Sequence, residues 1–198
     1  MSFLAIALIL FLIMDPFGNV SSYLTLMKNV EKKKRPKILA REMLFALGFM
    51  LLFNFIGEWI FSILKISETS VKISSGLILF IIALQILFPT LNSIRQNLPK
   101  GEPFLIPLAI PLIASPPLLA TIMLFARAED IHLVMMGAII IAWLGTYAVL
   151  LSSNFLLRLI GENGLMACEK LMGMILVLLA VQGFLDGVKQ FLSTATAV

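Results

Sequence analysis

The sequence is poor in the side chains from which metal sites and nucleophilic centres are built. It has one cysteine, Cys168, and one histidine, His132, among 198 residues. A single cysteine excludes an internal disulfide and a multi-cysteine metal site. The common zinc sites and nucleophile–base pairs need more members than these two residues supply. We therefore expect no resident metal and no cofactor, and we interpret His132 as a polar residue at a helix start.

Charge is also scarce, and long apolar segments take its place. Charged residues make up 13% of the chain and apolar residues 60%, whereas soluble domains have about 25% and about 45–50%. Six segments reach or approach the roughly 20 residues that span about 30 Å of hydrocarbon. We predict an all-α, polytopic membrane protein with six transmembrane helices over residues 2–27, 43–64, 73–94, 103–126, 133–157 and 171–188.

The few charges are distributed unevenly between the two sides of the membrane. Seven lysines and arginines lie between residues 28 and 41. The side of the membrane to which this segment belongs receives 11 lysines and arginines in all, and the other side receives 4. The positive-inside rule places the richer side in the cytoplasm, with both termini outside. A nucleic-acid or phosphoinositide site at residues 32–35 is the alternative. We favour a topology determinant resting on anionic lipid headgroups, and we expect the lipid bilayer as a partner but no nucleic acid.

The two halves of the chain share an internal repeat. At a shift of 97 residues the third segment matches the sixth, through Gly76, Leu79, Ala83 and Gln85 on Gly173, Leu176, Ala180 and Gln182. Each half, residues 1–96 and 97–198, holds three spans. Because three is odd, the second half enters the membrane in the opposite direction, which makes this a 3+3 inverted repeat.

Proline interrupts the first segment and the fourth at corresponding points. Asp15-Pro16 and Ser115-Pro116 lie about 13 and 12 residues into their segments, or roughly 18–20 Å at 1.5 Å per residue, near the bilayer centre. Asp and Ser are preferred N-caps, and proline is favoured at the first helical position. We therefore predict that helices one and four are broken. Such breaks are tolerated only where they face protein or a water-filled cavity.

Two helix N-termini that meet at the midplane have the partial positive charge and unpaired N–H groups that suit a carboxylate. We therefore predict a substrate-binding site at the two breaks, made by Asp15, Pro16, Phe17, Gly18, Asn19, Ser21, Ser115, Pro116, Pro117 and Thr121. Asp15 is the only acid we place in the middle of a span, where ionisable residues are costly and commonly functional. It is our candidate for proton coupling, and the alternative is a plain N-cap that holds the kink.

Several motifs resemble the MarC family of bacterial integral membrane proteins, and within it the YhgN-like branch, over nearly the whole chain. They are Ile13-Met14-Asp15-Pro16-Phe17-Gly18-Asn19, Ser74-Ser75-Gly76-Leu77-Ile78-Leu79-Phe80, Pro107-Leu108-Ala109-Ile110-Pro111-Leu112, Gly161-Glu162-Asn163-Gly164, Glu169-Lys170-Leu171-Met172-Gly173 and Phe184-Leu185-Asp186-Gly187. The resemblance implies six spans in the bacterial inner membrane, relationship to the LysE-type exporters, and transport of small neutral amino acids as in SnatA-type members. There are two departures from the family pattern: Ala114-Ser115-Pro116 stands where Ala-Gly-Pro is usual, and Ser74-Ser75-Gly76 stands where a Gly-Gly pair is usual.

We thus expect a secondary transporter for a small-molecule substrate, with small neutral amino acids as the substrate class that the resemblance implies. The alternative is a non-transporting inner-membrane structural or assembly protein. An intramembrane enzyme is disfavoured, because aspartyl chemistry needs two neighbouring carboxylates and we place one acid at this depth.

Overall fold

The computed structural model describes residues 3–28, 30–88, 113–128 and 132–195. Every regular element in these ranges is a helix, which confirms the predicted all-α class. The helices are α1 (Phe3–Ile13), α2 (Pro16–Leu26), α3 (Arg35–Leu64), α4 (Glu68–Leu87), α5 (Pro116–Ala128), α6 (His132–Leu151) and α7 (Ser153–Ala195). Five spans in the described part are long and apolar enough to cross a membrane. The first part of predicted helix four, residues 103–112 with Pro107 and Pro111, lies outside the described residues, and α5 is its second part.

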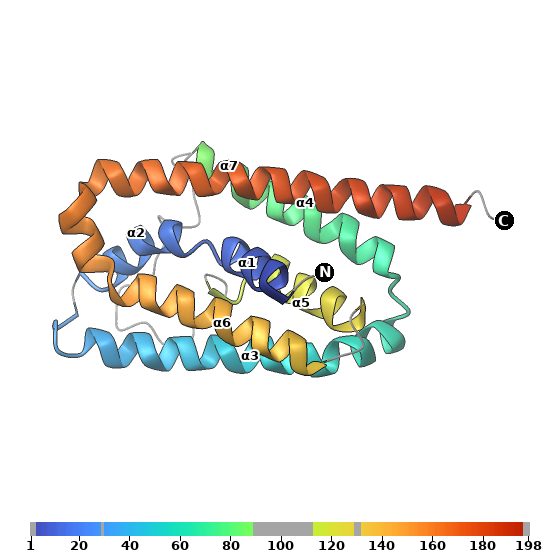
Figure 1. Cartoon of the computed structure of the whole chain (residues 1–198), viewed down its shortest axis with the longest axis horizontal. Helices are drawn as coiled ribbons and strands as arrows, with labels where there is room; N and C mark the ends of the chain where they lie inside the picture. The colour runs from blue at the N-terminus through green and yellow to red at the C-terminus, as the bar shows by residue number, and fades with distance from the viewer. Residues whose placement is uncertain (1–2, 29, 89–112, 129–131, 196–198) are drawn as a thin grey trace.

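The helices form three layers (Figure 1). Helices α4 and α7 pack together on one side, and α3 and α6 pack together on the other. The broken helix α1–α2 and the short α5 lie between these two pairs and contact both. The first span is accordingly the most buried, with 56% of its most apolar stretch inside the protein against 22–39% in the other spans. The centre of the fold is therefore built from the broken helix α1–α2 and the short α5.

Glycines allow α4 and α7 to approach closely. A Cβ atom at Gly76 would lie 2.8 Å from the backbone nitrogen of Phe184, and one at Gly187 would lie 2.7 Å from the side chain of Ile73. Near the other end of the pair, a Cβ atom at Gly173 would lie 2.8 Å from the side chain of Ile86. Early residues of α4 thus meet late residues of α7, and the two helices run antiparallel.

Two helices begin earlier than the charge-free segments predicted. Helix α3 starts at Arg35 rather than at residue 43, and α7 starts at Ser153 rather than at residue 171. Helix α7 has two helical parts, residues 153–160 and 162–195, and the longer part is about 51 Å long at 1.5 Å per residue, well over the hydrocarbon thickness. Helix α7 bends at Gly161, whose φ of 68° falls in the left-handed region that glycine tolerates. A helix continues into the headgroup region wherever its backbone bonds continue, so a charged residue does not mark its end.

Candidate functional site

The first predicted break is present, and side chains satisfy its backbone. Asp15 separates α1 from α2 and adopts a left-handed conformation with φ 44° and ψ 60°. Its carboxylate accepts a hydrogen bond from the Gly18 N–H at 3.2 Å, which confirms the predicted N-cap. The amide nitrogen of Asn19 donates to the Met14 carbonyl at 2.8 Å, so Asn19 satisfies a carbonyl at the end of α1. The chain is thus interrupted without leaving these groups unpaired.

Gly18 is required by the position of this cap. A Cβ atom at residue 18 would lie 2.1 Å from Oδ2 of Asp15, well inside van der Waals contact. The carboxylate therefore occupies the space that a side chain at residue 18 would fill. Glycine is needed here for close approach, not for an unusual φ.

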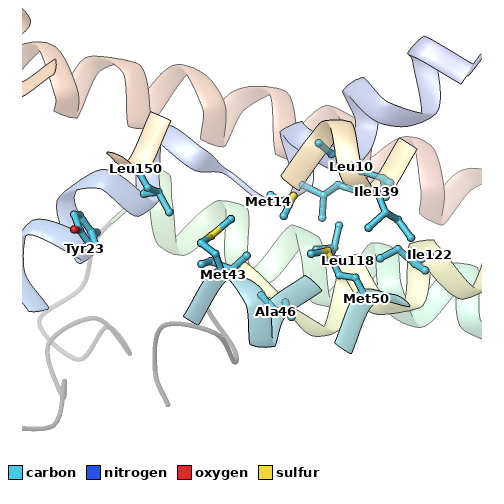
Figure 2. Close-up of a cluster of buried hydrophobic side chains, with 14 of the residues drawn as sticks. Leu10, Met14, Tyr23, Met43, Ala46, Met50, Leu118, Ile122, Ile139 and Leu150 are labelled. Carbon is cyan, nitrogen blue, oxygen red and sulfur yellow. The ribbon is translucent and has the colours of Figure 1, made fainter. Parts of the chain in front are cut away.

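The break faces protein, as broken helices at bilayer depth require. Asp15 is 6% exposed and Asn19 is 4% exposed. Figure 2 shows Met14, directly before Asp15, in one buried cluster with Leu118 from the first turn of α5 and Ile139 from α6. The start of α5 and the break in helix one are thus neighbours in the core.

The second predicted helix start is also present. Helix α5 begins at Pro116, and the Leu119 N–H donates to the Ser115 carbonyl at 3.0 Å. Ser115 is half-buried and Pro117 is buried. One turn further, the Thr121 hydroxyl donates to the Pro117 carbonyl at 2.8 Å. The hydroxyl oxygen of Thr121 keeps its acceptor capacity for a ligand.

A cavity of about 410 Å³ opens between α1, α4, α5 and α7. This volume lies within the roughly 300–1,000 Å³ range of small-molecule sites. One wall is apolar, made by Ile6, Ile9 and Ile13 of α1. Its polar side chains are Glu68, Lys72, Ser75, Thr121, Gln182 and Asp186. The cavity therefore extends from the end where α4 begins and α7 approaches its own end as far as Ile13 at the end of α1 and Thr121 in the second turn of α5.

The cavity contains charges of both signs. Glu68 and Lys72 are one turn apart on α4, and Gln182 and Asp186 are one turn apart on α7. The Gln182 amide donates to both carboxylate oxygens of Asp186 at 3.0 Å, and the Lys72 ammonium donates to Gln190 at 2.8 Å. These groups make the mouth of the cavity polar, while its inner part is lined mainly by aliphatic and aromatic side chains.

Of the ten predicted site residues, Thr121 lines this cavity. Ile13 lines it too, and Asp15 follows two residues later, so the cavity ends next to the first break rather than between the two breaks. The other nine are Asp15, Pro16, Phe17, Gly18, Asn19, Ser21, Ser115, Pro116 and Pro117, and they lie outside its lining. Whether they bind substrate stays a prediction.

Sequence reasoning missed the charged residues at the mouth. Lys72 comes directly before the predicted span 73–94 and Asp186 lies near the end of the predicted span 171–188, and neither was assigned to a site. The signal that marks them is the spacing of four residues from Glu68 to Lys72 and from Gln182 to Asp186, which places each pair on one helix face. That these two faces share a cavity follows from packing between distant helices.

Glu42 is a second residue that sequence reasoning missed. It is fully buried in α3, and its carboxylate pairs with Arg41 at 2.9 Å. Because α3 begins eight residues before the predicted span, this acid lies inside a helix rather than at the edge of a loop. Asp15 is therefore not the only buried acid of the protein.

Hydrogen bonds outside the cavity also join neighbouring helices. The Lys170 ammonium donates to the carbonyls of Ile86 and Leu87 at the end of α4, the first at 2.7 Å. The Trp143 indole donates to the Met43 carbonyl at 2.8 Å, joining α6 to α3. A cation at a helix C-terminus is also favoured by the helix dipole.

Comparisons with known proteins identify one family over nearly the whole chain. A family model described as MarC family integral membrane protein matches residues 1–192. UPF0056 inner membrane protein YhgN of Escherichia coli (strain K12) is 46% identical over 190 residues, which are 94% of this chain and 95% of the relative. UPF0056 membrane proteins of Buchnera aphidicola subsp. Baizongia pistaciae (44%, covering 95% and 96%) and Pyrococcus abyssi (30%, covering 91% and 90%) are also similar. No solved structure matches.

Proposed function

Because the chain belongs to the MarC family of integral membrane proteins, we propose that it is a secondary transporter of small neutral amino acids in the bacterial inner membrane. The observation that carries the proposal is the cavity, which extends from one end of the helix bundle to Ile13 before the first break and to Thr121 in the second turn of α5. In many transporters the substrate site lies near the bilayer midplane at interrupted helices. The proposal assigns no catalytic step to the protein.

Alternating access follows from the asymmetry of the bundle. The cavity opens at the end where α4 begins, and contacts of Lys170 and Trp143 join the helices nearer the other end. In our proposal the state with the open cavity mouth is one of two states. Substrate passes the breaks when the mouth closes and the contacts of Lys170 and Trp143 separate. Broken helices suit this role because they pack centrally and touch both flanking helix pairs.

Contacts between α4 and α7 support the proposed inverted repeat. Gly76 packs against Phe184, and Gly173 packs against Leu87. A shift of 97 residues relates Gly76 to Gly173 and Leu87 to Phe184, so the second contact repeats the first with the two halves of the chain exchanged. A two-fold axis in the membrane plane would produce this pattern. In the same way, α2 packs on α7 while α5 packs on α4. We propose residues 1–96 and 97–198 as the two units.

The orientation in our proposal comes from the basic segment between α2 and α3. Lys32, Lys33 and Lys34 are exposed there, at the end of the molecule opposite the C-terminus in Figure 1. Under the positive-inside rule this end is cytoplasmic. Both termini and the cavity mouth then face outward, and the state described here is open to the outside.

The purified protein in liposomes should accumulate labelled alanine, glycine or serine above protein-free liposomes, and a proton gradient should alter the rate. Thr121→Val should raise the KM for uptake by about 2- to 12-fold, since one hydrogen bond contributes about 0.5–1.5 kcal/mol. The matched control is Thr25→Val on α2, because the Thr25 hydroxyl makes the same intrahelical bond, to Ser21, outside the cavity lining. If none of the three amino acids moves in either direction, the proposed function is wrong.

A further inference from the structure

Glu68, Lys72 and Asp186 share the cavity mouth, and Lys72 and Asp186 do not pair with each other. Within the described part of the chain, the Lys72 ammonium bonds to the uncharged side chain of Gln190, and the Asp186 carboxylate bonds to the uncharged side chain of Gln182. Lys72 is half-buried, so its charge is partly withdrawn from water. Asp186 is exposed, and both residues line the same cavity.

Helices α4 and α7 approach each other closely beside these two residues. A Cβ atom at Gly187 would lie 3.1 Å from Cβ of Lys72, so the lysine stem runs beside the residue that follows Asp186. Gly187 and Asp186 belong to the Phe184-Leu185-Asp186-Gly187 motif, for which the transport proposal has no role so far. The absence of a side chain at Gly187 lets the lysine of α4 enter the same cavity as the aspartate of α7.

We propose that Lys72 and Asp186 are specificity-determining residues that receive the carboxylate and the ammonium group of a zwitterion at the mouth of the cavity. This inference rests on the proposed function, and it places substrate selection ahead of the breaks. Lys72 has three N–H donors and uses one on Gln190, and an ionised carboxylate offers more acceptor sites than the two that Gln182 occupies. Each charge therefore has capacity left for a ligand.

A zwitterion fits these charges better than an ion of one sign. A cation would give the Lys72 ammonium no ligand group to bind, although Glu68 lies one turn before it, and an anion would give the Asp186 carboxylate none. Sites built to pair a ligand group reject analogues that lack it, because the protein group is then left unpaired. We expect the mouth to discriminate by charge at both ends of a small molecule, and the aliphatic wall of α1 to receive its side chain.

Binding to the purified protein in detergent tests this without requiring transport. L-alanine is compared by calorimetry with alaninamide, which keeps the ammonium group, and with propionate, which keeps the carboxylate. Wild type should bind alanine at least ten-fold tighter than either analogue. Lys72→Met should bind alanine and alaninamide equally, and Asp186→Asn should bind alanine and propionate within about three-fold. A misfolded variant would instead lose binding of all three ligands, and not only the preference for alanine over one analogue.

Matched controls lie on α7 outside the cavity lining. Lys189→Met and Glu162→Gln remove the same charges at exposed positions, and both should keep the wild-type preference for alanine. Equal binding of alanine and alaninamide by wild type would identify a cation site and overturn the inference. Unchanged preference in both cavity variants would overturn it while leaving wild-type uptake, and so the proposed function, intact. Zwitterion preference that depends on Lys72 and Asp186, without any uptake, would uphold the inference and reject transport.

Discussion

Asp15→Ala should abolish uptake, whereas Asp15→Asn should keep the protein folded and remove its response to a proton gradient. Alanine at residue 15 loses the N-cap, at about 1 kcal/mol. It must also hold a left-handed backbone, at about 1–2 kcal/mol for a residue with a Cβ atom. The end of α1 and the start of α2 would then lose the geometry that holds the break. We expect at least a ten-fold loss of uptake and a lower thermal midpoint.

Asparagine separates the structural role of Asp15 from a role in coupling. It caps helices about as well as aspartate and tolerates the left-handed region, so the free energy of unfolding should change by less than about 1 kcal/mol. It cannot exchange a proton at neutral pH. Uptake by Asp15→Asn liposomes is therefore measured with and without an imposed pH gradient. A gradient response equal to that of wild type would show that Asp15 is a cap and not the coupling group.

Gly76→Ala should strongly destabilise the packing of α4 against α7, and more than Gly173→Ala near the other end of this helix pair. The added Cβ atom would lie 2.8 Å from the Phe184 nitrogen and 3.0 Å from the Ala180 carbonyl oxygen. Both are backbone atoms of α7, so the two helices must separate. Overpacking of a tight contact typically costs about 1–3 kcal/mol. The thermal midpoint of the purified protein, followed by tryptophan fluorescence, should fall by several degrees.

Two further variants serve as graded controls. At Gly173 the new Cβ atom meets side-chain carbons of Ile86 and Leu87, which can rotate, so Gly173→Ala should cost less than Gly76→Ala. At Gly48 nothing lies within 4 Å, and alanine should be neutral or stabilise the helix by up to about 1 kcal/mol through its higher helix propensity. An equal loss at Gly48 and Gly76 would contradict the close α4–α7 contact.

The sequence predicted the features that depend on local chemistry. Asp15-Pro16 and Ser115-Pro116 mark helix starts because capping and the missing proline N–H act within one turn, and α2 and α5 begin at these prolines. The all-α class and the membrane spans follow from apolar length alone. Even the hydrogen bond from the Gly18 N–H to Asp15 is a local consequence of the N-cap position.

The cavity could not be predicted in the same way. Its walls come from four helices that are distant in the chain, and the side-by-side placement of Lys72 and Gly187 depends on the register of α4 against α7. Glu42 was missed for another reason. The predicted span ends at the first charge, because it was bounded by a charge-free stretch. The helix itself begins at Arg35, so Glu42, which pairs with Arg41, lies inside it.

The central claim, that one cavity reaches from the outer face to the interrupted helices, is tested most directly by thiol labelling. In a Cys168→Ala background, Thr121→Cys is exposed in right-side-out vesicles to a membrane-impermeant thiol reagent, with fully buried Leu118→Cys as the control. We predict that Thr121→Cys reacts from the outside, that L-alanine slows the reaction, and that Leu118→Cys does not react. Labelling of Thr121→Cys no faster than Leu118→Cys, or only from the cytoplasmic side, would contradict the account.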